Sequence, residues 1–426
     1  MVAGVVGPGG RCVVGHGKLA AGDARVPDGE TIFEIGSVTK VFTSLALADM
    51  VNRGAVALED PAGKYLPEGV RMPERGGRAI TLHDLATHRS GLPPMPGNLN
   101  LDPRSTSDEY GVKELYQFLA GYALPREPGS EYEYSNLGAG LLGVLLANRA
   151  GTDYERLIRD RITRPLGMPD TVITLSASMR QRMATGHNGM LGAVANSDVS
   201  APLAGAGALR ASVNDMLALL EACLGYRETS LASAISGMLA APRPAGQMEI
   251  GLGWLVMSSH GKKIVGHNGA TGGFRSFAGY DPAERVGVVV LSNACTAGGV
   301  DDIGFHLLNP KAPLADFAAP QPRTEISVNP EILAGYTGRY QVMPNLVFEI
   351  TRDGARLFAQ GFAQLPHKQP GELTALPQFE LFAESEKKFF ARVADNQFSF
   401  ETDPAGRAIG LVLHRGGRDS HGPRLL

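Results

Sequence analysis

Apolar residues recur at helical spacing from Val38 onward, which predicts a helix that ends near Gly54. The apolar positions in this segment are Val41, Phe42, Leu45 and Ala48. They lie on more than one side of the helix, so we expect it to be buried between a sheet and other helices.

Further helical patterns follow between residues 80 and 240. The clearest of them are Thr81–Thr87, Lys113–Gly121, Leu137–Ala150 and Asn214–Cys223. The segment 91–104 is rich in proline and glycine and predicts an irregular loop near the mouth of a site. This middle part of the chain therefore predicts a lobe made almost entirely of helices.

Short strand patterns flank that lobe on both sides in the sequence. Val2–Val6 and Arg11–Gly15 predict an N-terminal hairpin. After the lobe come four runs that predict an antiparallel meander: Leu252–Met257, Lys263–Gly266, Arg275–Tyr280 and Val286–Ser292. Hairpin and meander together predict one antiparallel sheet of five or more strands, backed by helices. The fold class expected is therefore α+β.

The pattern changes again after a stretch rich in proline and alanine, residues 310–323. Beyond it, strand patterns follow one another closely: Gly338–Val342, Leu346–Thr351, Ala355–Gly361, Phe379–Ala383, Phe389–Val393, Phe398–Glu401 and Ala408–His414. Strands this short and this numerous predict a small closed antiparallel barrel. We therefore expect a first domain over 1–312, a linker over 313–327 and a barrel domain over 328–426.

Composition narrows the range of functions. The chain has 426 residues, 43% of them hydrophobic, and a formal net charge of −3. It contains no basic run suited to a phosphate backbone, so nucleic-acid binding is not expected. Its three cysteines are far apart and form no metal-ligand spacing, so a metal site is not expected. Self-association into a homo-oligomer stays open.

Hydropathy and the N-terminus bear on location. No stretch of about 18 apolar residues occurs, so no membrane span is predicted. Strand-like residues follow Met1 directly, without the basic and apolar regions of a secretory signal. We therefore expect a cytoplasmic protein, or a periplasmic or secreted one if a leader has been removed.

The candidate chemistry begins at Ser37-Val-Thr-Lys40, which places a hydroxyl and an amine three residues apart. Residues at this spacing share one face of a helix, so the amine of Lys40 can reach the hydroxyl of Ser37. A nucleophilic serine needs a neighbouring base and a positive field, and a helix N-terminus supplies part of that field. The alternative is a capping serine followed by a surface lysine.

Two further motifs follow in order, Tyr134-Ser135-Asn136 and His267-Asn268-Gly269. Together with Ser37 and Lys40 they resemble the three motifs of the serine β-lactamase and penicillin-binding-protein superfamily. The Tyr-Ser-Asn form resembles the class C β-lactamase branch and its esterase and D-aminopeptidase relatives. The flanking phrases also resemble that branch: Leu85–Pro93 and Gly251–Trp254. The resemblance covers residues 2 to 300 and implies a β-lactamase/transpeptidase-like fold.

A second resemblance concerns the C-terminal region. The predicted barrel and the phrase Leu333–Tyr340 resemble the lipocalin-like domain that follows the hydrolase domain in some members of this superfamily.

The first resemblance implies roles for individual residues. Ser37 would be the nucleophile, and Lys40 and Tyr134 would share the work of taking its proton. Either Lys40 has a lowered pKa and is the base itself, or its ammonium lowers the pKa of Tyr134 and a phenolate is the base. The sequence does not separate these two possibilities. Asn136 would contact both the substrate and Lys40, although its place before an apolar helix also fits a helix cap.

The third motif would line the substrate site. Backbone N–H groups of Ser37 and Ala270 would form the oxyanion hole, with Gly269 beside them. The β-lactamase pattern would have Lys-Thr-Gly where this chain has His-Asn-Gly, beginning at His267. A histidine is only partly charged near neutrality, so we expect weaker recognition of a substrate carboxylate than a lysine would give.

The function expected is that of a serine hydrolase that forms an acyl-enzyme on Ser37 and needs no cofactor. Its candidate substrates are small molecules or peptides: D-amino-acid peptides or amides, small esters and, weakly, β-lactams. Acyl transfer at the same serine is an alternative, as in penicillin-binding-protein-like thioesterases and transpeptidases. A non-turnover binding protein that is acylated and never deacylated is a second alternative.

Overall fold

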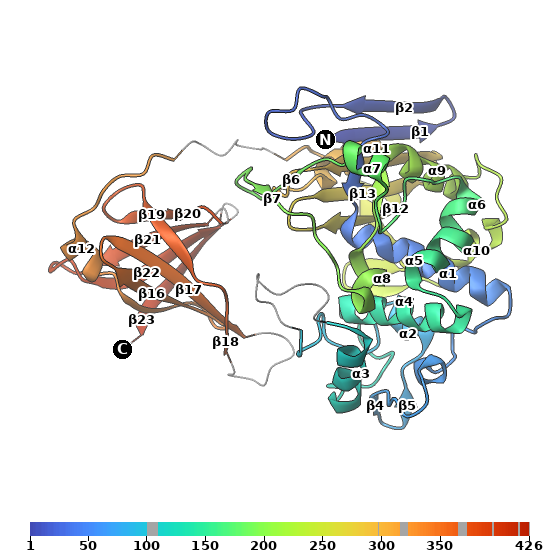
Figure 1. Ribbon diagram of the computed structural model, residues 1–426, viewed down its shortest axis with the longest axis horizontal. Coiled ribbons are helices and arrows are strands. Elements are labelled where there is room, and N and C mark those ends of the chain that lie inside the picture. Colours follow the sequence, from blue (N-terminus) through green and yellow to red (C-terminus); the bar gives the residue numbers. More distant parts are fainter. Residues whose placement is uncertain are drawn as a thin grey trace. The chain divides into compact units, whose positions relative to one another are not determined.

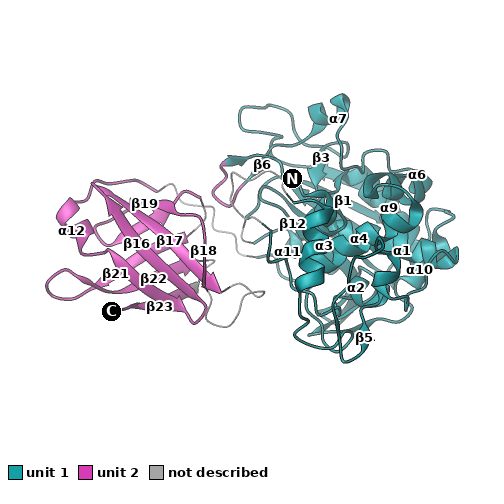
Figure 2. Cartoon of the chain, turned by 60° about the horizontal axis from the view of Figure 1, so that its bottom comes forward, with its two compact units in different colours: residues 1–100, 105–187, 193–316 teal, residues 101–104, 188–192, 317–426 magenta. Residues whose placement is uncertain are grey.

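The structure is a computed structural model and describes residues 1–99, 110–296, 298–315, 323–364, 373–393, 396–415 and 418–425. The chain divides into two compact units, which are coloured separately in Figure 2. The first, here the serine unit, holds the described residues up to 315 except 188–192. The second, here the barrel unit, holds 188–192 and the described residues from 323 onward.

One antiparallel sheet of eight strands runs through the serine unit, in the order β2-β1-β14-β13-β12-β11-β10-β9 (Figure 1). The strands are β1 (Val2–Gly7), β2 (Gly10–Gly15), β9 (Arg243–Ala245), β10 (Met248–Ile250), β11 (Leu255–Ser259), β12 (Lys262–Ala270), β13 (Arg275–Asp281) and β14 (Val286–Ser292). Because β1 pairs with β14, the N-terminal hairpin joins the meander in one sheet, as the sequence predicted.

Helices are the main regular structure between β2 and β9 among the described residues. They are α1 (Thr39–Asn52), α2 (Leu82–Ala86), α3 (Val112–Gly121), α4 (Asn136–Ala150), α5 (Tyr154–Ile158), α6 (Arg164–Leu166), α7 (Ala177–Arg182), α8 (Ala204–Gly207), α9 (Val213–Leu224) and α10 (Ala232–Gly237). The four helices predicted from periodicity in this lobe, now α2, α3, α4 and α9, begin and end within one residue of the expected positions. After the sheet, α11 (Asp301–Leu308) follows β14.

Short strand pairs complete the serine unit among its described residues. They are β3 (Ile32–Glu34) with β8 (Arg210–Ser212), β4 (Glu74–Arg75) with β5 (Arg78–Ala79), and β6 (Gly186–His187) with β7 (Ala193–Val194). Two or three residues are too few to show an alternating pattern, so the sequence did not reveal them.

Both faces of β14, an inner strand of the large sheet, are buried. On β14, Val289 and Leu291 belong to the main core, which also contains the apolar residues of α9. Val288 and Val290 point the other way, into a smaller core that includes Leu308 of α11. Successive residues of a strand face opposite sides, so a strand covered on both sides is apolar throughout.

Helix α1 lies at the centre of the serine unit. Every residue from Thr39 to Met50 is buried, and the helix packs against α4, α8 and α10. This confirms the expectation that a helix with apolar residues on several sides lies between other elements. The two ionisable side chains within this buried run are Lys40 and Asp49.

The strand predicted over Leu252–Met257 begins later than expected, at the first residue of β11. Gly253 has a φ of +71°, and a Cβ there would lie 2.8 Å from the backbone oxygen of Lys40. The chain therefore turns closely against α1 before β11 begins. The next residue, Trp254, is 1% exposed, and its ring meets Tyr280 edge-on at 5.7 Å.

The barrel unit is a closed antiparallel barrel, as predicted. Eight strands follow the order β16-β15-β23-β22-β21-β20-β19-β17, and β17 pairs back with β16 to close the ring. They are β15 (Gly338–Met343), β16 (Leu346–Asp353), β17 (Arg356–Gln364), β19 (Phe379–Ala383), β20 (Lys388–Ala391), β21 (Asn396–Thr402), β22 (Ala408–Arg415) and β23 (Arg418–Leu425). A short strand, β18 (Leu373–Ala375), is attached to β17, and the helix α12 (Pro330–Ala334) precedes the barrel.

Aromatic rings make up much of the core of the barrel. The buried ones are Tyr336, Tyr340, Phe348, Phe389, Phe398 and Phe400. Tyr336 and Phe400 are stacked with their centroids 4.3 Å apart. An eight-stranded barrel has an interior just wide enough for side chains to fill, and here these rings fill it.

The sequence did not predict β18 or β23. Strand β23 carries Gly422 and Pro423, residues that argue against a strand, and it lacks apolar alternation. Its pairing with β22 on one side and β15 on the other gives it its conformation. Such long-range pairing is not visible in local sequence.

Candidate active site

Ser37 lies in a single turn of 3₁₀ helix, η1 (Gly36–Val38), that leads directly into α1. The φ of Gly36 is +49°, and a Cβ there would lie 2.8 Å from the backbone nitrogen of Ala270. A Cβ on Gly269 would lie 3.0 Å from the backbone nitrogen of Ser37. Two glycines therefore allow the end of β12 to lie against the turn that carries the serine.

The amine of Lys40 has three oxygen neighbours. Its Nζ lies 3.0 Å from Ser37 Oγ, 2.8 Å from Asn136 Oδ1 and 2.7 Å from the backbone oxygen of Ala206. The oxygens of Asn136 and Ala206 can only accept hydrogen bonds, whereas the hydroxyl of Ser37 can also donate. A neutral amine thus satisfies all three contacts by donating twice and directing its lone pair at Ser37.

Burial favours that neutral form. Lys40 is 2% exposed, and desolvation lowers its pKa from 10.5 to about 7. No carboxylate of a described residue lies within ion-pair distance of Nζ to oppose the shift. At neutral pH a large share of the molecules therefore carries an uncharged amine beside Ser37.

Tyr134 lies on the other side of the serine. Its phenol hydrogen bonds with Ser37, and burial raises its pKa to about 12. The Nζ of Lys40 is 4.8 Å from the centre of its ring. The phenol is therefore protonated at neutral pH and can donate a hydrogen bond to the serine oxygen.

The cap of α4 is Ser135 and not Asn136. The hydroxyl of Ser135 accepts a hydrogen bond from the backbone N–H of Gly138 at 2.8 Å. The sequence had left the cap as an alternative role for Asn136. With Ser135 in that position, the amide of Asn136 is available to Lys40.

His88 supports the second motif and was missed as a site residue. The sequence did not single it out, but it is 3% exposed and lies against the ring of Tyr134, with the centroids 4.4 Å apart. Its Nδ1 accepts a hydrogen bond from the backbone N–H of Ser135 at 3.1 Å. Burial, with the nearby charges of Lys40 and His267, holds its pKa well below the usual value. The sequence signal that could have identified His88 is its place within the flanking segment Leu85–Pro93.

Backbone oxygens at the end of the segment Leu85–Pro93, and of Pro94 directly after it, hold the Tyr134–Asn136 motif in position. The hydroxyl of Ser135 donates to the backbone oxygen of Pro93 at 2.7 Å. The backbone N–H of Asn136 donates to Pro94 at 3.0 Å. Ser135 and Asn136 are thus anchored to this loop, and Tyr134 directly precedes them in the chain.

His267 lies near the end of β12, with its ring 6.5 Å from that of Tyr134. Desolvation first, and then the charge of Lys40, lowers its pKa to about 4. The expectation of a partly charged histidine near neutrality is therefore wrong. Its Nδ1 donates to the backbone oxygen of Asn268 at 2.6 Å, which leaves Nε2 as an acceptor.

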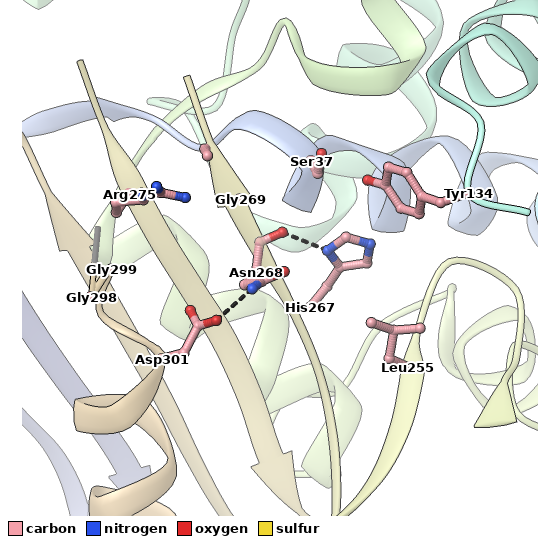
Figure 3. Close-up of a pocket in the computed structure, with 11 residues that line it drawn as sticks. Ser37, Tyr134, Leu255, His267, Asn268, Gly269, Arg275, Gly298, Gly299 and Asp301 are labelled. Carbon is pink, nitrogen blue, oxygen red and sulfur yellow. Dashed lines mark hydrogen bonds between the residues drawn. The ribbon is translucent and has the colours of Figure 1, made fainter. Parts of the chain in front are cut away.

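These residues border one pocket of about 380 Å³, shown in Figure 3. It is lined by Ser37, Tyr134, Leu255, His267, Asn268, Gly269, Ala270, Arg275, Gly298, Gly299 and Asp301. Lys40 and Asn136 lie behind the serine and do not line it. Arg275 and Asp301 were not singled out from the sequence, because no motif there distinguishes them from other charged residues.

Asp301 is tied to the third motif. Asn268 donates from its side-chain amide to a carboxylate oxygen of Asp301, a contact drawn in Figure 3. Burial raises the pKa of Asp301, while that hydrogen bond and the charge of Arg275 oppose the rise. Asp301 and Arg275 thus place an acidic and a cationic side chain on the side of the pocket away from Tyr134.

The described part of the chain contains neither a metal-binding cluster nor a membrane-spanning helix. None of its His, Cys, Asp and Glu side chains form a group of three that could hold a metal ion. Among the same residues, no helix is both long and apolar enough to cross a membrane.

Comparison with known proteins agrees with this geometry. The family model described as Beta-lactamase matches residues 1–307. The chain belongs to the beta-lactamase family. The resemblance inferred from the three motifs is therefore confirmed.

Two relatives of this beta-lactamase family member are informative. The D-alanyl-D-alanine-carboxypeptidase/endopeptidase AmpH of Escherichia coli K12 is 30% identical over 292 residues, which cover 65% of this chain and 74% of AmpH. A structure of a beta-lactamase/D-alanine carboxypeptidase from Yersinia pestis, complexed with citrate, is 26% identical with a TM-score of 0.64. That match covers 73% of this chain and 92% of the other.

A class C beta-lactamase from Rhodobacter sphaeroides is also similar, with 26% identity and a TM-score of 0.60. It covers 69% of this chain and 89% of its own. These relatives support the β-lactamase/transpeptidase-like fold for the serine unit. They also support a serine hydrolase that acts on an amide or a β-lactam.

Proposed function

We propose that this protein hydrolyses amide bonds of D-amino-acid peptides through an acyl-enzyme on Ser37, accepts small esters, and turns over β-lactams weakly. The observation that carries the proposal is the set of contacts made by Lys40. Its Nζ donates to two oxygens that can only accept, so its lone pair is left for the hydroxyl of Ser37 at 3.0 Å. A base at that distance is within reach of the proton that it must take.

Acylation follows from this arrangement. Lys40 takes the proton from Ser37, and the serine oxygen attacks the carbonyl carbon of the substrate. The carbonyl oxygen becomes negative and is stabilised by the backbone N–H groups of Ser37 and Ala270. The bond to the leaving group then breaks, and the leaving nitrogen or oxygen takes a proton from the phenol of Tyr134. Lys40 returns its proton to the phenol, so that both groups regain their starting states.

Deacylation again uses Lys40 as the base. A water molecule gives its proton to Lys40 and attacks the ester carbonyl. Ser37 leaves with the proton that Lys40 has taken up, and the free acid is released. Tyr134 keeps its proton in the resting enzyme, because its pKa is raised to about 12 while that of Lys40 is lowered to about 7. These opposite shifts favour Lys40 as the resting base over a Tyr134 phenolate.

Two observations support peptides over β-lactams as the main substrates. His267 stands where the β-lactamase pattern has a lysine, and its lowered pKa leaves it uncharged near neutrality. The relative AmpH is described as a D-alanyl-D-alanine carboxypeptidase and endopeptidase. The absence of the lysine of the β-lactamase pattern weakens the case for penicillin turnover, and the similarity to AmpH supports a peptide substrate.

The test is a comparison of substrates at Ser37. The wild type should release D-alanine continuously from N-acetyl-D-alanyl-D-alanine, hydrolyse p-nitrophenyl acetate, and turn over nitrocefin slowly. The L,L-dipeptide serves as the matched control. The Ser37→Ala variant should lose all activity with its fold intact, because loss of the nucleophile costs on the order of 10³-fold or more.

The same assays separate the two alternatives. A stoichiometric burst from the ester without a steady state would identify a non-turnover binding protein. Product that shifts from the free acid to an adduct when an amine acceptor is added would identify an acyl-transfer enzyme.

A further inference from the structure

A serine, a histidine and an aspartate are joined by hydrogen bonds on the wall of the barrel unit. The Oγ of Ser399 on β21 lies 2.8 Å from Nε2 of His414 on β22. The Nδ1 of His414 lies 2.7 Å from a carboxylate oxygen of Asp419 on β23. The three strands are neighbours in the barrel (Figure 1), and these residues, here the barrel triad, do not line the pocket around Ser37.

Strand pairing places the barrel triad on the outer face of the wall. Ser399 stands between Phe398 and Phe400, which are 0% and 3% exposed and belong to the core of the barrel, so Ser399 points outward. His414 lies directly opposite Asp419 in the register of β22 and β23, and Ser399 lies diagonally from His414 across β21 and β22. Side chains at opposite and diagonal positions on one face are within reach of each other.

The atoms in contact assign a role to each group of the barrel triad. A carboxylate can only accept, so Nδ1 of the neutral imidazole carries the proton and donates to Asp419. Nε2 is then the acceptor for the hydroxyl proton of Ser399. In this arrangement a histidine can take the proton of a nucleophilic serine, while the carboxylate holds the ring in the required tautomer and orientation. The side chain of His414 is 27% exposed, so a reagent in solution can reach it.

A cation lies on the other side of Ser399. Lys388 of β20 is directly opposite Ser399 in the register of β20 and β21, and its ammonium is 3.7 Å from the carboxylate of Glu384. Because Ser399 lies on an inner strand, its backbone N–H points at a neighbouring strand and is not aimed at a bound reagent. Lys388 can stabilise an oxygen that becomes negative beside Ser399, although a mobile side chain does so less well than fixed backbone donors.

The barrel triad therefore favours one half of a hydrolytic cycle. Acylation by an aryl ester or a thioester expels a stable leaving group and needs little help at the carbonyl oxygen. Hydrolysis of the resulting serine ester has to expel an alkoxide, and fixed oxyanion donors contribute on the order of 10²- to 10³-fold to such a step. Without them the acyl group stays on the serine.

We propose that Ser399 is a second reactive serine, which accepts an acyl group from an activated ester or thioester and retains it. A bond forms between Oγ of Ser399 and the acyl carbon, while the bond from that carbon to the leaving oxygen or sulfur breaks. The serine proton passes to Nε2 of His414 and from there to the leaving group. The barrel unit thus carries a covalent acylation site of its own. This inference goes beyond the hydrolysis proposed for Ser37 and does not depend on it.

Peptide mass spectrometry of the full-length Ser37→Ala variant tests the inference, because this variant removes acylation and turnover at Ser37. After incubation with p-nitrophenyl acetate, we expect a stable acetyl group on Ser399. Ser385 is the internal control, read in the same spectrum. It is an exposed serine of the same unit whose hydroxyl accepts from the backbone N–H of Lys388 at 3.1 Å. It is more exposed than Ser399 but is not bonded to a histidine, so it should stay unmodified.

Three variants in the Ser37→Ala background assign the roles. His414→Gln should slow acetylation of Ser399 at least 100-fold, within the range for loss of a general base. Asp419→Asn keeps an acceptor for the imidazole but removes the charge; because this carboxylate is 56% exposed and therefore screened, we expect a loss of about tenfold. Lys388→Met should slow the reaction about threefold, as expected for an exposed and mobile cation.

The outcomes separate this proposal from the function proposed for Ser37. Acetylation of Ser399 that is no faster than that of Ser385 overturns the reactive serine. So does a His414→Gln variant that melts at a lower temperature but is acetylated at an unchanged rate, because the barrel triad then only stabilises the wall. Where His414→Gln fails to fold, the rate in Asp419→Asn decides in the same way. A wild type that releases no D-alanine but is acetylated on Ser399 overturns the hydrolysis alone.

Discussion

The pH dependence of catalysis provides a decisive test of the base. Moving the pKa of Lys40 from 10.5 to about 7 corresponds to roughly 5 kcal/mol against the charged form, at about 1.4 kcal/mol per pH unit. In the proposed mechanism only the neutral amine can take the proton from Ser37. The rate constant kcat/KM, which reports the free enzyme, should therefore rise with pH and level off above about 7. Between pH 5 and pH 8 the expected rise is about 100-fold.

The assay uses p-nitrophenyl acetate, read at the isosbestic wavelength of p-nitrophenol, with Ser37→Ala as the blank for spontaneous hydrolysis. His267 does not interfere, because its pKa is lowered to about 4. Asp215 requires a control, since burial raises its pKa to about 7 as well. It accepts a hydrogen bond from Thr171 at 2.8 Å and does not line the pocket. The Asp215→Asn variant should therefore keep the wild-type profile.

Two results would refute this reasoning. A rate that continues to climb above pH 9 without a plateau would identify a phenolate of Tyr134 as the base. A rate that falls as pH rises through 7 would show that the ammonium form of Lys40 is the active one.

Three further predictions concern the groups around the base. Lys40→Ala and Tyr134→Phe should each reduce kcat nearly as much as loss of the nucleophile, and the double variant should be hardly worse, since groups that act as one unit are not additive; losses that multiply would show independent roles. The variant His88→Asn tolerates the φ of +55° but removes the ring against Tyr134 and the acceptor for Ser135. It should lower kcat at least tenfold with little change in KM, whereas a normal kcat would show that His88 is purely structural. The ratio of wild-type activities on the acid and amide forms of the dipeptide should stay constant from pH 6 to 8, because His267 is neutral throughout. A ratio that falls across that range would show that His267 is charged.

Local pattern was sufficient for much of the fold. The apolar positions after Val38 fixed both the existence and the burial of α1, because a helix that is apolar on several sides has to be covered. The short apolar runs of β14 and its neighbours, separated by turn residues, predicted the meander. The motif spacing placed Ser37, Tyr134 and His267 in order, and the structure brings all three to one pocket.

Other features depend on contacts between distant segments. Arg275 belongs to no recognisable motif. It lines the pocket because the pairing of β12 with β13 places it opposite Ala270. His88 lies far from Tyr134 in the sequence, and only the fold stacks the two rings. The protonation state of His267 depends on its burial and on the nearness of Lys40. Local sequence shows neither of these. Strand β23 owes its conformation to its two neighbours.

The location of the single tryptophan has a spectroscopic consequence. Trp254 belongs to the serine unit, packed edge-on against Tyr280, and the barrel unit contains no other. Indole fluorescence during denaturation therefore reports the loosening of the catalytic unit alone. We expect the stacked rings of Tyr336 and Phe400 to add a near-ultraviolet dichroism signal from the barrel. If the two units unfold separately, two signals of the intact chain follow them, without cutting the polypeptide or attaching a dye.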